Sequence, residues 1–314
     1  MAEIRYDRIP VHDAGGMIIH LPVVDIGPSP PVMAIVAGIH GDEPSPLCLI
    51  DRFVLAVRDL PLSGGIRILA AANPPALLQR ARWSNWDDED MNRVGDGSGG
   101  PALTRRLAEA VCEAVTGCKV CVNLHNFIMR TPLLAIQPPG LSPERQARHR
   151  QYIQALDPHV VWVFGSGPTD QHAFSTSLDA AMEARGVDSF AVEMADLPEL
   201  DEPLLARGIA GLLRLAAQLG ILADGERPPK RNAVYVRRQL MRSPGAGIFE
   251  AIAPLGGTVE EGEIVGELVP MERPGDRVLI RATASGWLIQ RLGRRFVRPG
   301  DMIASIGIPL EAGP

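Results

Sequence analysis

The stretch Val32-Met-Ala-Ile-Val-Ala-Gly-Ile-His-Gly-Asp-Glu43 decides the fold that we expect for this chain. It starts as a short apolar strand, residues 32–37, and continues within a few residues into His40 and Glu43. In open α/β sheets, ligands bind beyond the carboxyl ends of the strands, so polar residues at this place indicate a site. The His-x-x-Glu spacing allows one turn of the chain to offer two ligands to a single metal ion.

Outward from this stretch, residues 1 to about 232 alternate short apolar strands with longer helical patterns. This alternation predicts an α/β sheet with helices on both faces. Further strands are expected at residues 66–71, 120–124, 160–164 and 190–193. Helices are expected at residues 47–57, 103–115, 145–156, 177–185 and 203–218. The segment 73–100, rich in Pro, Trp, Asn and Gly, is expected to be an irregular functional loop.

The last 80 or so residues have a different pattern of short strands and glycine turns. A polar Pro/Gly segment precedes them, which places a domain boundary between residues 1–232 and 233–314. An internal repeat, in which Val259 and Gly262 correspond to Val297 and Gly300, predicts a small all-β sandwich similar to biotinyl and lipoyl carrier domains. The connector between the halves has no lysine, so we expect an accessory, pocket-rimming or oligomerising role instead of a covalent cofactor arm.

Composition narrows the class of protein. With 314 residues and 46 % hydrophobic content, the chain can bury a full core. A net charge of −6 gives no basic field for nucleic acid or an anionic membrane, and the apolar runs are too short to span a bilayer. The first residues contain no apolar signal core, and the few cysteines fit a reducing compartment, so a cytoplasmic protein is expected. We assign no chemistry to the four cysteines, Cys48, Cys112, Cys118 and Cys121.

Two more of the expected strands end in polar residues that suit the same site. His125 follows Glu43 by 82 residues in the run Asn-Leu-His-Asn, and Glu193 ends the strand that begins at Phe190. Two ligands separated by a short spacer, with a third after a long spacer, are typical of a catalytic zinc site. Three protein ligands leave the fourth coordination position of the zinc ion open for water. Glu193 can then take a proton from that water and return it to a departing amine.

The long loop contributes positive charge and amide donors through Arg80, Arg82, Asn92 and Arg93. Beside a metal ion, one arginine can polarise a carbonyl group while another binds a substrate carboxylate. The alternative is a solvent-facing loop in which neighbouring acidic residues balance these charges. Arg130, five residues after His125, is a further candidate for the pocket.

Together, the motifs resemble those of the succinylglutamate desuccinylase/aspartoacylase family of zinc hydrolases. The matching features are His40-Gly-Asp-Glu43, the Asn73-Pro pair with Arg82, Asp90-Met-Asn-Arg93, Leu124-His125 and Ala191-Val-Glu193. The resemblance implies a carboxypeptidase-like mixed sheet with a C-terminal β-domain. It also implies one zinc ion per chain on His40, Glu43 and His125, carbonyl polarisation by Arg82, substrate-carboxylate binding by Asn92 and Arg93, and proton transfer by Glu193.

Two departures from the family pattern affect this transfer. The segment from Arg82 to Asp90 is longer than the pattern, which leaves Arg80 as an alternative to Arg82. The family commonly has Asp two residues before the third zinc ligand, where this chain has Asn123, and Asn126 follows that ligand. If the residue at position 123 orients His125, metal affinity depends on the presence of Asn in place of Asp there.

The sequence therefore predicts a zinc-dependent amidohydrolase that removes an acyl group from an N-acylated amino acid or small amine. A carboxypeptidase-like metallopeptidase uses the same three ligands and is the first alternative. A non-catalytic zinc- or ligand-binding protein with a degenerate site is the second. The expected partner is a small N-acyl substrate, without nucleic acid or membrane, and a homo-oligomer is compatible with the C-terminal domain.

Overall fold

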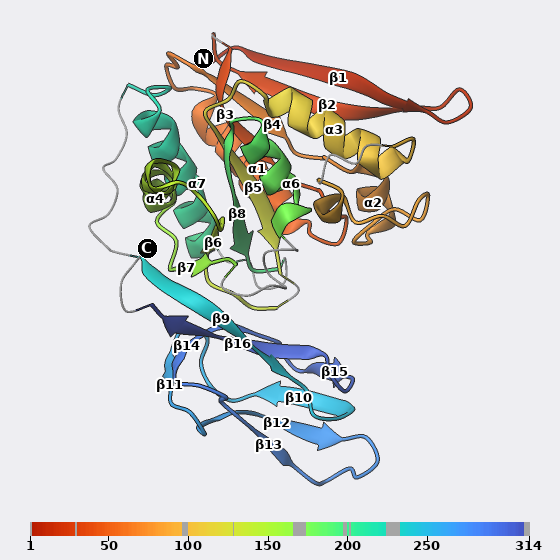
Figure 1. Cartoon of the computed structure of the whole chain (residues 1–314), viewed down its shortest axis with the longest axis vertical. Helices are drawn as coiled ribbons and strands as arrows, with labels where there is room; N and C mark the ends of the chain where they lie inside the picture. Colours follow the sequence, from red (N-terminus) through yellow and green to blue (C-terminus); the bar gives the residue numbers. More distant parts are fainter. Residues whose placement is uncertain are drawn as a thin grey trace.

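The computed structural model describes residues 2–28, 30–95, 100–127, 129–165, 174–196, 200, 202–223 and 233–310. Its centre is a 12-stranded mixed sheet (Figure 1). Across the sheet the strands are β1 (Ile4–Asp13), β2 (Ile18–Ile26), β4 (Gly65–Leu69), β3 (Pro31–Val36), β5 (Val120–Asn126), β8 (Asp188–Met194), β6 (Leu134–Gln137), β7 (Val160–Val163), β9 (Val234–Arg242), β16 (Met302–Pro309), β14 (Gly286–Arg291) and β11 (Thr258–Val259).

Three neighbouring strands in the middle of this sheet are parallel. β3 pairs with β5, and β5 pairs with β8, so the carboxyl ends of all three lie at one edge. Their side chains alternate between two faces. On one face lie Val122, Leu124, Phe190 and Val192, and on the other lie Cys121, Asn123, His125, Ala191 and Glu193. The first set is purely apolar, and the second becomes polar toward the strand ends.

Helices cover both faces, as the sequence pattern predicts. On the first face, α1 (Ser45–Val57), α4 (Pro143–Leu156) and α7 (Glu202–Gln218) bury the larger hydrophobic core. On the other face, α3 (Leu103–Val115) and α6 (Leu178–Ala184) bury a second core. Two short helical segments, α2 (Pro74–Gln79) and η1 (Met91–Arg93), lie within the long segment after β4. The sheet is thus enclosed in the middle and open at the edge where the polar residues gather.

The C-terminal region is an antiparallel β-sandwich. A second, four-stranded sheet has the order β13 (Val278–Arg281), β12 (Ile264–Pro270), β10 (Gly247–Ala251) and β15 (Arg295–Val297). Phe249, Leu268, Leu288 and Ile306 belong to the core between this sheet and the end of the large one. Because β9 pairs with β7 on one side and β16 on the other, the large sheet continues from the α/β part into the sandwich.

The internal repeat is visible in the pairing of the short strands. β11 of the first half pairs with β14 of the second, and β15 of the second half pairs with β10 of the first. Gly262 and Gly300, which the repeat aligns, have φ angles of 86° and 84°. A positive φ favours glycine, so the same backbone conformation explains why both halves of the repeat have glycine at this turn.

The predicted mixed α/β architecture with a C-terminal β region is confirmed. The structure adds elements that the pattern did not reveal: the N-terminal hairpin of β1 and β2, the four-residue strand β6, and α2 inside the segment expected to be irregular. The predicted boundary after residue 232 lies at the edge of residues 224–232, which are outside the described part, and it stays a prediction. Among the described residues, no helix combines the length and apolar character needed to cross a membrane.

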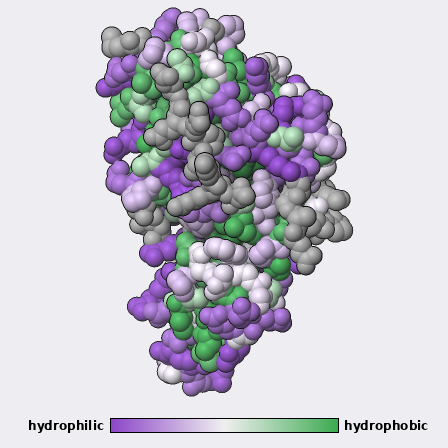
Figure 2. Space-filling model, turned by 90° about the vertical axis from the view of Figure 1, so that its left-hand side faces the viewer, coloured by the Kyte–Doolittle hydropathy of each residue, from purple (hydrophilic) through white to green (hydrophobic). Residues whose placement is uncertain are grey.

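On the side of the molecule shown in Figure 2, hydrophobic side chains gather on the narrower C-terminal part. Exposed hydrophobic residues of this region include Ile248, Leu279 and Phe296, which lie on β10, β13 and β15. Such surface is compatible with the oligomerising role expected for the region, which stays a prediction.

Candidate metal and substrate site

The loop after β3 carries the first two candidate ligands, and two glycines shape it. Gly38 has a φ angle of 67°, where a side chain would be strained. At Gly41, a Cβ atom would lie 1.8 Å from the carbonyl oxygen of Ala76 in α2. Because only glycine allows α2 to pack this closely, the loop is fixed with His40 and Glu43 both buried.

Glu43 bridges the two candidate histidines. Its Oε1 lies 2.6 Å from Nδ1 of His40, and its Oε2 lies 2.7 Å from Nδ1 of His125. The imidazole rings are 5.2 Å apart between centroids. The structure thus brings together the three residues that the sequence predicts as metal ligands, with all donor atoms within 4.8 Å of one another.

Electrostatics couple these three groups strongly. Burial would raise the pKa of the Glu43 carboxyl, but His125 and His40 outweigh burial and lower that pKa well below its usual range. Burial likewise opposes the charged form of His125, but the Glu43 carboxylate outweighs it and raises the pKa of His125 to about 9. A metal ion would replace the protons that the histidines share with Glu43, so its affinity should depend on pH.

The surroundings of His40 fit a metal ligand. Its Nε2 lies 3.1 Å from Oδ1 of Asp90, while its Nδ1 faces Glu43. A carboxylate on one ring nitrogen fixes the tautomer in which the other nitrogen has a free lone pair for a metal ion. Burial would raise the pKa of Asp90, but the hydrogen bond and charge of His40, together with the positive charge of Arg82, outweigh burial and lower this pKa below its usual range, so the carboxylate stays charged. Two imidazoles and a carboxylate are a donor set that zinc commonly accepts.

Asn126 holds the strand end against the loop. Its Oδ1 accepts a hydrogen bond from the backbone amide of Ser45 at 3.0 Å. Its own backbone amide donates to Oε2 of Glu43 at 3.4 Å. Asn126 therefore connects β5 to the start of α1, so the asparagine that follows His125 has a structural role.

Arg82 lies at the triad, as predicted. Its Nε donates to Oδ2 of Asp90 at 2.9 Å, and its Nη1 lies 3.6 Å from Oε1 of Glu43. The side chain is 37 % exposed, so one edge of the guanidinium remains accessible from the cavity. This geometry fixes a cation beside the triad, where a positive charge can stabilise negative charge that develops on a ligand.

Glu193 is the register partner of His125 across β5 and β8. It is buried, and its Oε2 has no hydrogen-bond partner among the described residues. Burial raises the pKa of Glu193 to about 7, with Glu43 adding to the increase and His125 opposing it. A carboxyl group that titrates near neutral pH beside a metal triad is suited to exchange protons with a reacting group.

These side chains line one cavity of about 260 Å³. Asn92 and Arg93 also line it, from η1. Asn92 accepts a hydrogen bond from the backbone amide of Leu178 at 3.0 Å, which ties η1 to the start of α6. Arg93 is exposed, and its Nη1 donates to the backbone carbonyl of Asn92 at 2.6 Å. It forms no ion pair with any described residue, so its other N–H groups can bind a ligand.

The structure does not bring Arg80 and Arg130 to this cavity, and the expectation that they bind substrate is revised. Arg80 is the exposed left-handed cap of α2, with φ 52°, and it is not among the described residues that line the cavity. Arg130 bridges through its backbone to Arg291 of β14, and its side chain lines a different cavity with Pro132 and His159. Of these two alternatives, Arg82 and not Arg80 therefore lies beside the candidate metal site.

The catalytic-domain family of succinylglutamate desuccinylases and aspartoacylases matches residues 29–219, which include every residue of the triad as well as Arg82 and Glu193. This match covers more than half of the chain. The chain belongs to the succinylglutamate desuccinylase/aspartoacylase family. As members of this family are deacylating hydrolases, the site of this desuccinylase/aspartoacylase homologue is a hydrolase site.

Solved structures extend the similarity over the whole fold of this family member. The product-bound ectoine utilization protein EutE (DoeB) from Ruegeria pomeroyi is 21 % identical, with a TM-score of 0.81 over 98 % of this chain and 95 % of that one. A succinylglutamate desuccinylase/aspartoacylase from Rhodobacter sphaeroides is 20 % identical, with a TM-score of 0.82 over 99 % and 96 %. An aspartoacylase family protein from Mesorhizobium loti is 22 % identical, with a TM-score of 0.79 over 99 % and 96 %. No curated protein sequence matches the chain.

Asn123 stands where the family commonly has Asp, and it contacts a carboxylate from another part of the chain that the sequence did not reveal. Nδ2 of Asn123 donates to Oδ2 of Asp179 at 3.0 Å, and Ser189 donates to the other oxygen at 2.7 Å. Asp179 is buried and lies on α6, in the wall of the cavity. This desuccinylase/aspartoacylase homologue therefore has a buried carboxylate against Asn123, and it comes from a helix instead of from the strand that carries His125.

A second group of potential metal ligands in this homologue is a neutralised ion-pair network. His149, Glu183 and Asp188 are buried close together, with His149 Nε2 lying 2.9 Å from Oε1 of Glu183. Arg145 contacts both carboxylates, at 2.5 Å and 3.0 Å, and Arg148 contacts Asp188 at 2.8 Å. Two guanidinium groups already balance the two carboxylates, so this network stabilises the packing of α4 against β8 and α6.

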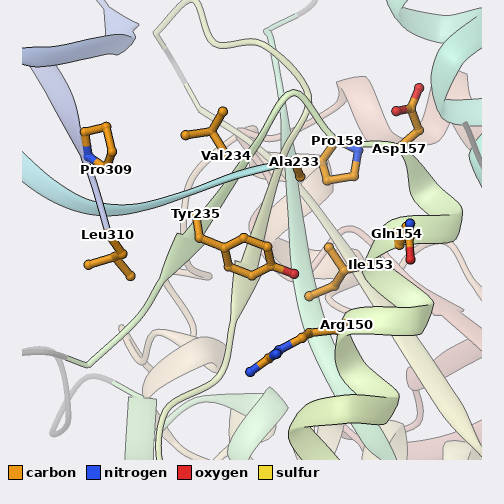
Figure 3. A pocket seen from close by; sticks show the side chains of 10 residues that line it. All are labelled: Arg150, Ile153, Gln154, Asp157, Pro158, Ala233, Val234, Tyr235, Pro309 and Leu310. Carbon is orange, nitrogen blue, oxygen red and sulfur yellow. The ribbon is translucent and has the colours of Figure 1, made fainter. Parts of the chain in front are cut away.

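A larger cavity, of about 530 Å³, lies elsewhere in the homologue (Figure 3). Arg150 and Tyr235 reach into it from α4 and β9. Tyr235 and Val236 are consecutive in β9 and point to opposite faces of the sheet. None of the candidate ligands lines the larger cavity, and it shares no described lining residue with the triad cavity.

Proposed function

We propose that this protein is a zinc-dependent amidohydrolase that removes an acyl group from an N-acylated amino acid or a similar small amine. One observation carries the proposal: His40, Glu43 and His125 converge within 4.8 Å, in one cavity with Arg82 and Glu193. When bound there, zinc would polarise the amide carbonyl and make a water molecule acidic enough to act as a nucleophile near neutral pH.

Residues of the chain itself bind the substrate and polarise its carbonyl group. Arg93 and the side chain of Asn92 bind the carboxylate of the amino acid, because Arg93 offers a planar fork that no described carboxylate occupies. Arg82, held by Asp90, donates to the carbonyl oxygen as negative charge develops on it.

Glu193 transfers the proton. It accepts a proton from the attacking water as oxygen bonds to the carbonyl carbon, and it delivers that proton to the amide nitrogen as the C–N bond breaks. The products are a carboxylic acid and a free amine. Burial of Glu193 supports this role, because its raised pKa makes both steps accessible near pH 7.

The test is amine release from N-acetyl, N-formyl and N-succinyl amino acids and diamines, with dipeptides and tripeptides in the same assay. We expect the zinc-loaded protein to release amine from at least one acyl compound, and a chelator to abolish the activity until zinc is restored. Cleavage of peptides alone would indicate a carboxypeptidase-like enzyme. No cleavage with unchanged zinc binding would indicate a binding protein.

A further inference from the structure

The cavity of about 530 Å³ in Figure 3 contains a cation that no described carboxylate pairs with. Arg150 reaches into this cavity from α4 and is partly buried. Its Nε is shielded from solvent and has no hydrogen-bond partner among the described residues. A shielded N–H group without an acceptor lowers the stability of the fold, so a ligand that supplies an acceptor would bind favourably here.

Asp157 also lines the cavity, but its carboxylate is already paired. Its Oδ2 lies 2.9 Å from Nη2 of Arg207, and Nε of Arg207 donates to the backbone carbonyl of Asp157 at 2.7 Å. No other acidic residue is among the described residues that line the cavity. The guanidinium of Arg150 is therefore the unbalanced charge of this described lining, and it favours an anion.

Tyr235 provides a second hydrogen-bond donor. Its ring extends from β9 into the cavity, with the hydroxyl group on the side of α4 (Figure 3). Burial raises the pKa of this hydroxyl, and the positive charge of Arg150 opposes the increase, so the hydroxyl keeps its proton at neutral pH. A planar guanidinium edge together with a hydroxyl donor matches the two oxygens of a carboxylate.

The other walls of the cavity are mostly apolar. Ile153, Pro158, Val234, Pro309 and Leu310 are among the residues that line it. A volume of about 530 Å³ is within the range of small-molecule sites, which combine apolar walls with a few polar groups. An inorganic anion would leave these walls uncovered, whereas an organic acid would bury apolar surface against them.

The cavity lies where the α/β part meets the C-terminal sandwich. Arg150 belongs to α4, whereas Tyr235 belongs to β9, and the amide of Leu310, just after β16, donates to the Tyr235 carbonyl at 3.0 Å. Arg238, three residues after Tyr235 on β9, lines the cavity of the metal triad. The two cavities thus share a strand but no described lining residue, so a ligand can occupy one while the other stays empty.

We propose that this cavity is a second ligand site, separate from the triad cavity, for a small organic acid with an apolar body, whose carboxylate binds the Arg150 guanidinium and the Tyr235 hydroxyl. The site does not depend on the proposed hydrolase function. A bound acid contacts α4, β9 and the residues after β16 together, so it stabilises the joint between the two parts of the chain by mass action.

Arg237 provides a matched control for Arg150. It is exposed, lies two residues after Tyr235 on the same side of β9, and is not among the described residues that line the cavity. Arg150→Met and Arg237→Met remove the same charge, but only the first removes it from the cavity. Arg150→Lys retains the charge without the planar edge, and Tyr235→Phe removes only the hydroxyl. Arg93→Met removes the proposed carboxylate binder of the triad cavity, so it reports binding at that other site.

The experiment is calorimetry of the zinc-loaded protein at pH 7 with benzoate, isovalerate, their neutral amides and inorganic phosphate. We expect at least one acid to bind with a Kd of about 1 mM or lower, and its amide and phosphate to bind about tenfold more weakly or less. Arg150→Met should weaken binding of the acid by about 10- to 100-fold, and Tyr235→Phe by about 2- to 10-fold. Arg150→Lys should retain part of the affinity, whereas Arg237→Met and Arg93→Met should leave it unchanged. The same acid in excess should raise the Tm of wild type but not that of Arg150→Met.

Absence of binding by both acids, equal binding of acid and amide, or unchanged binding in Arg150→Met would overturn the proposal. Binding that is lost in Arg93→Met and retained in Arg150→Met would place the acid in the triad cavity and would also overturn it. Phosphate that binds as tightly as the acids would contradict the need for an apolar body. Circular dichroism checks the folding of each variant. If Arg150→Met does not fold, loss of acid binding in Arg150→Lys and Tyr235→Phe, against retention in Arg237→Met, decides the question.

Discussion

Asn123 and Asp179 share a buried hydrogen bond in which Nδ2 of Asn123 donates to Oδ2 of Asp179 at 3.0 Å. Both residues are nearly inaccessible to solvent, and Asn123 lies two residues before the candidate ligand His125. Ser189 donates to the remaining oxygen of Asp179. Because the amide is a donor and the carboxylate an acceptor, the pair tolerates a carboxylate on either partner but not on both.

The first prediction exchanges these two groups. Asn123→Asp alone places two carboxyl groups at hydrogen-bond distance inside the protein, so at pH 7 one must take up a proton or remain an unpaired buried charge. We expect a loss of about 3 kcal/mol in the free energy of unfolding. The double variant Asn123→Asp, Asp179→Asn restores one donor and one acceptor, and we expect stability within about 1 kcal/mol of wild type. Urea denaturation of all variants measures both values, and additive losses in the double variant would contradict the pairing.

The second prediction concerns Glu193. Glu193→Gln keeps the shape of the side chain but cannot accept a proton, so we expect kcat to fall by about 10²- to 10⁴-fold. Metal content, measured by elemental analysis, should stay at the wild-type level, because Glu193 is not one of the three converging ligands. Glu183→Gln is a control in another buried carboxyl, outside this cavity. Near-normal turnover in Glu193→Gln would exclude the proton-transfer role.

A third prediction follows from the raised pKa of Glu193, which burial brings to about 7. The proton acceptor is active only when ionised, so kcat/KM should increase with pH until Glu193 has lost its proton. A bound cation adds positive charge nearby and favours ionisation, so the midpoint of the increase should lie at or below about 7. The measurement is a pH profile of kcat/KM for wild type between pH 5 and 9. A profile that is flat over this range, or that increases only above pH 8, would show that another group limits the reaction.

The sequence was sufficient for those parts of the site that depend on local pattern. His40, Glu43, His125 and Glu193 follow short apolar strands, and the parallel sheet brings strand ends together whatever the details of packing. Glycine spacing likewise identified the repeat in the C-terminal region, because positive φ angles leave a direct trace in the sequence.

Residues that join the site only through packing of distant elements were not predictable. Asp179 is 56 residues from Asn123, and nothing in its helix marks it as a partner for β5. Arg238 reaches the cavity because β9 pairs with β7, and pairing between distant strands cannot be read from one sequence. Arg130 was misplaced for the same reason: its short distance from His125 in the chain does not reveal that its backbone turns toward β14.

The last prediction concerns Asp90, which orients two residues of the site at once. Its Oδ1 lies 3.1 Å from Nε2 of His40, and its Oδ2 accepts from Nε of Arg82 at 2.9 Å. Asp90→Asn replaces one acceptor with an amide donor, so either His40 or Arg82 loses its partner. Since carboxylates behind ligating histidines commonly contribute 10- to 100-fold to metal affinity, we expect zinc affinity to fall by this factor.

Asp88→Asn provides the matched control for this change, because Asp88 is exposed in the same loop, and its φ angle of 52° is one that Asn tolerates. Competition with a fluorescent zinc chelator measures affinity in both variants. Since Asp90 also holds Arg82, kcat of fully zinc-loaded Asp90→Asn should remain below that of Asp88→Asn. Full recovery of kcat at saturating zinc would mean that Asp90 acts on the metal site alone, and that Arg82 keeps its position without it.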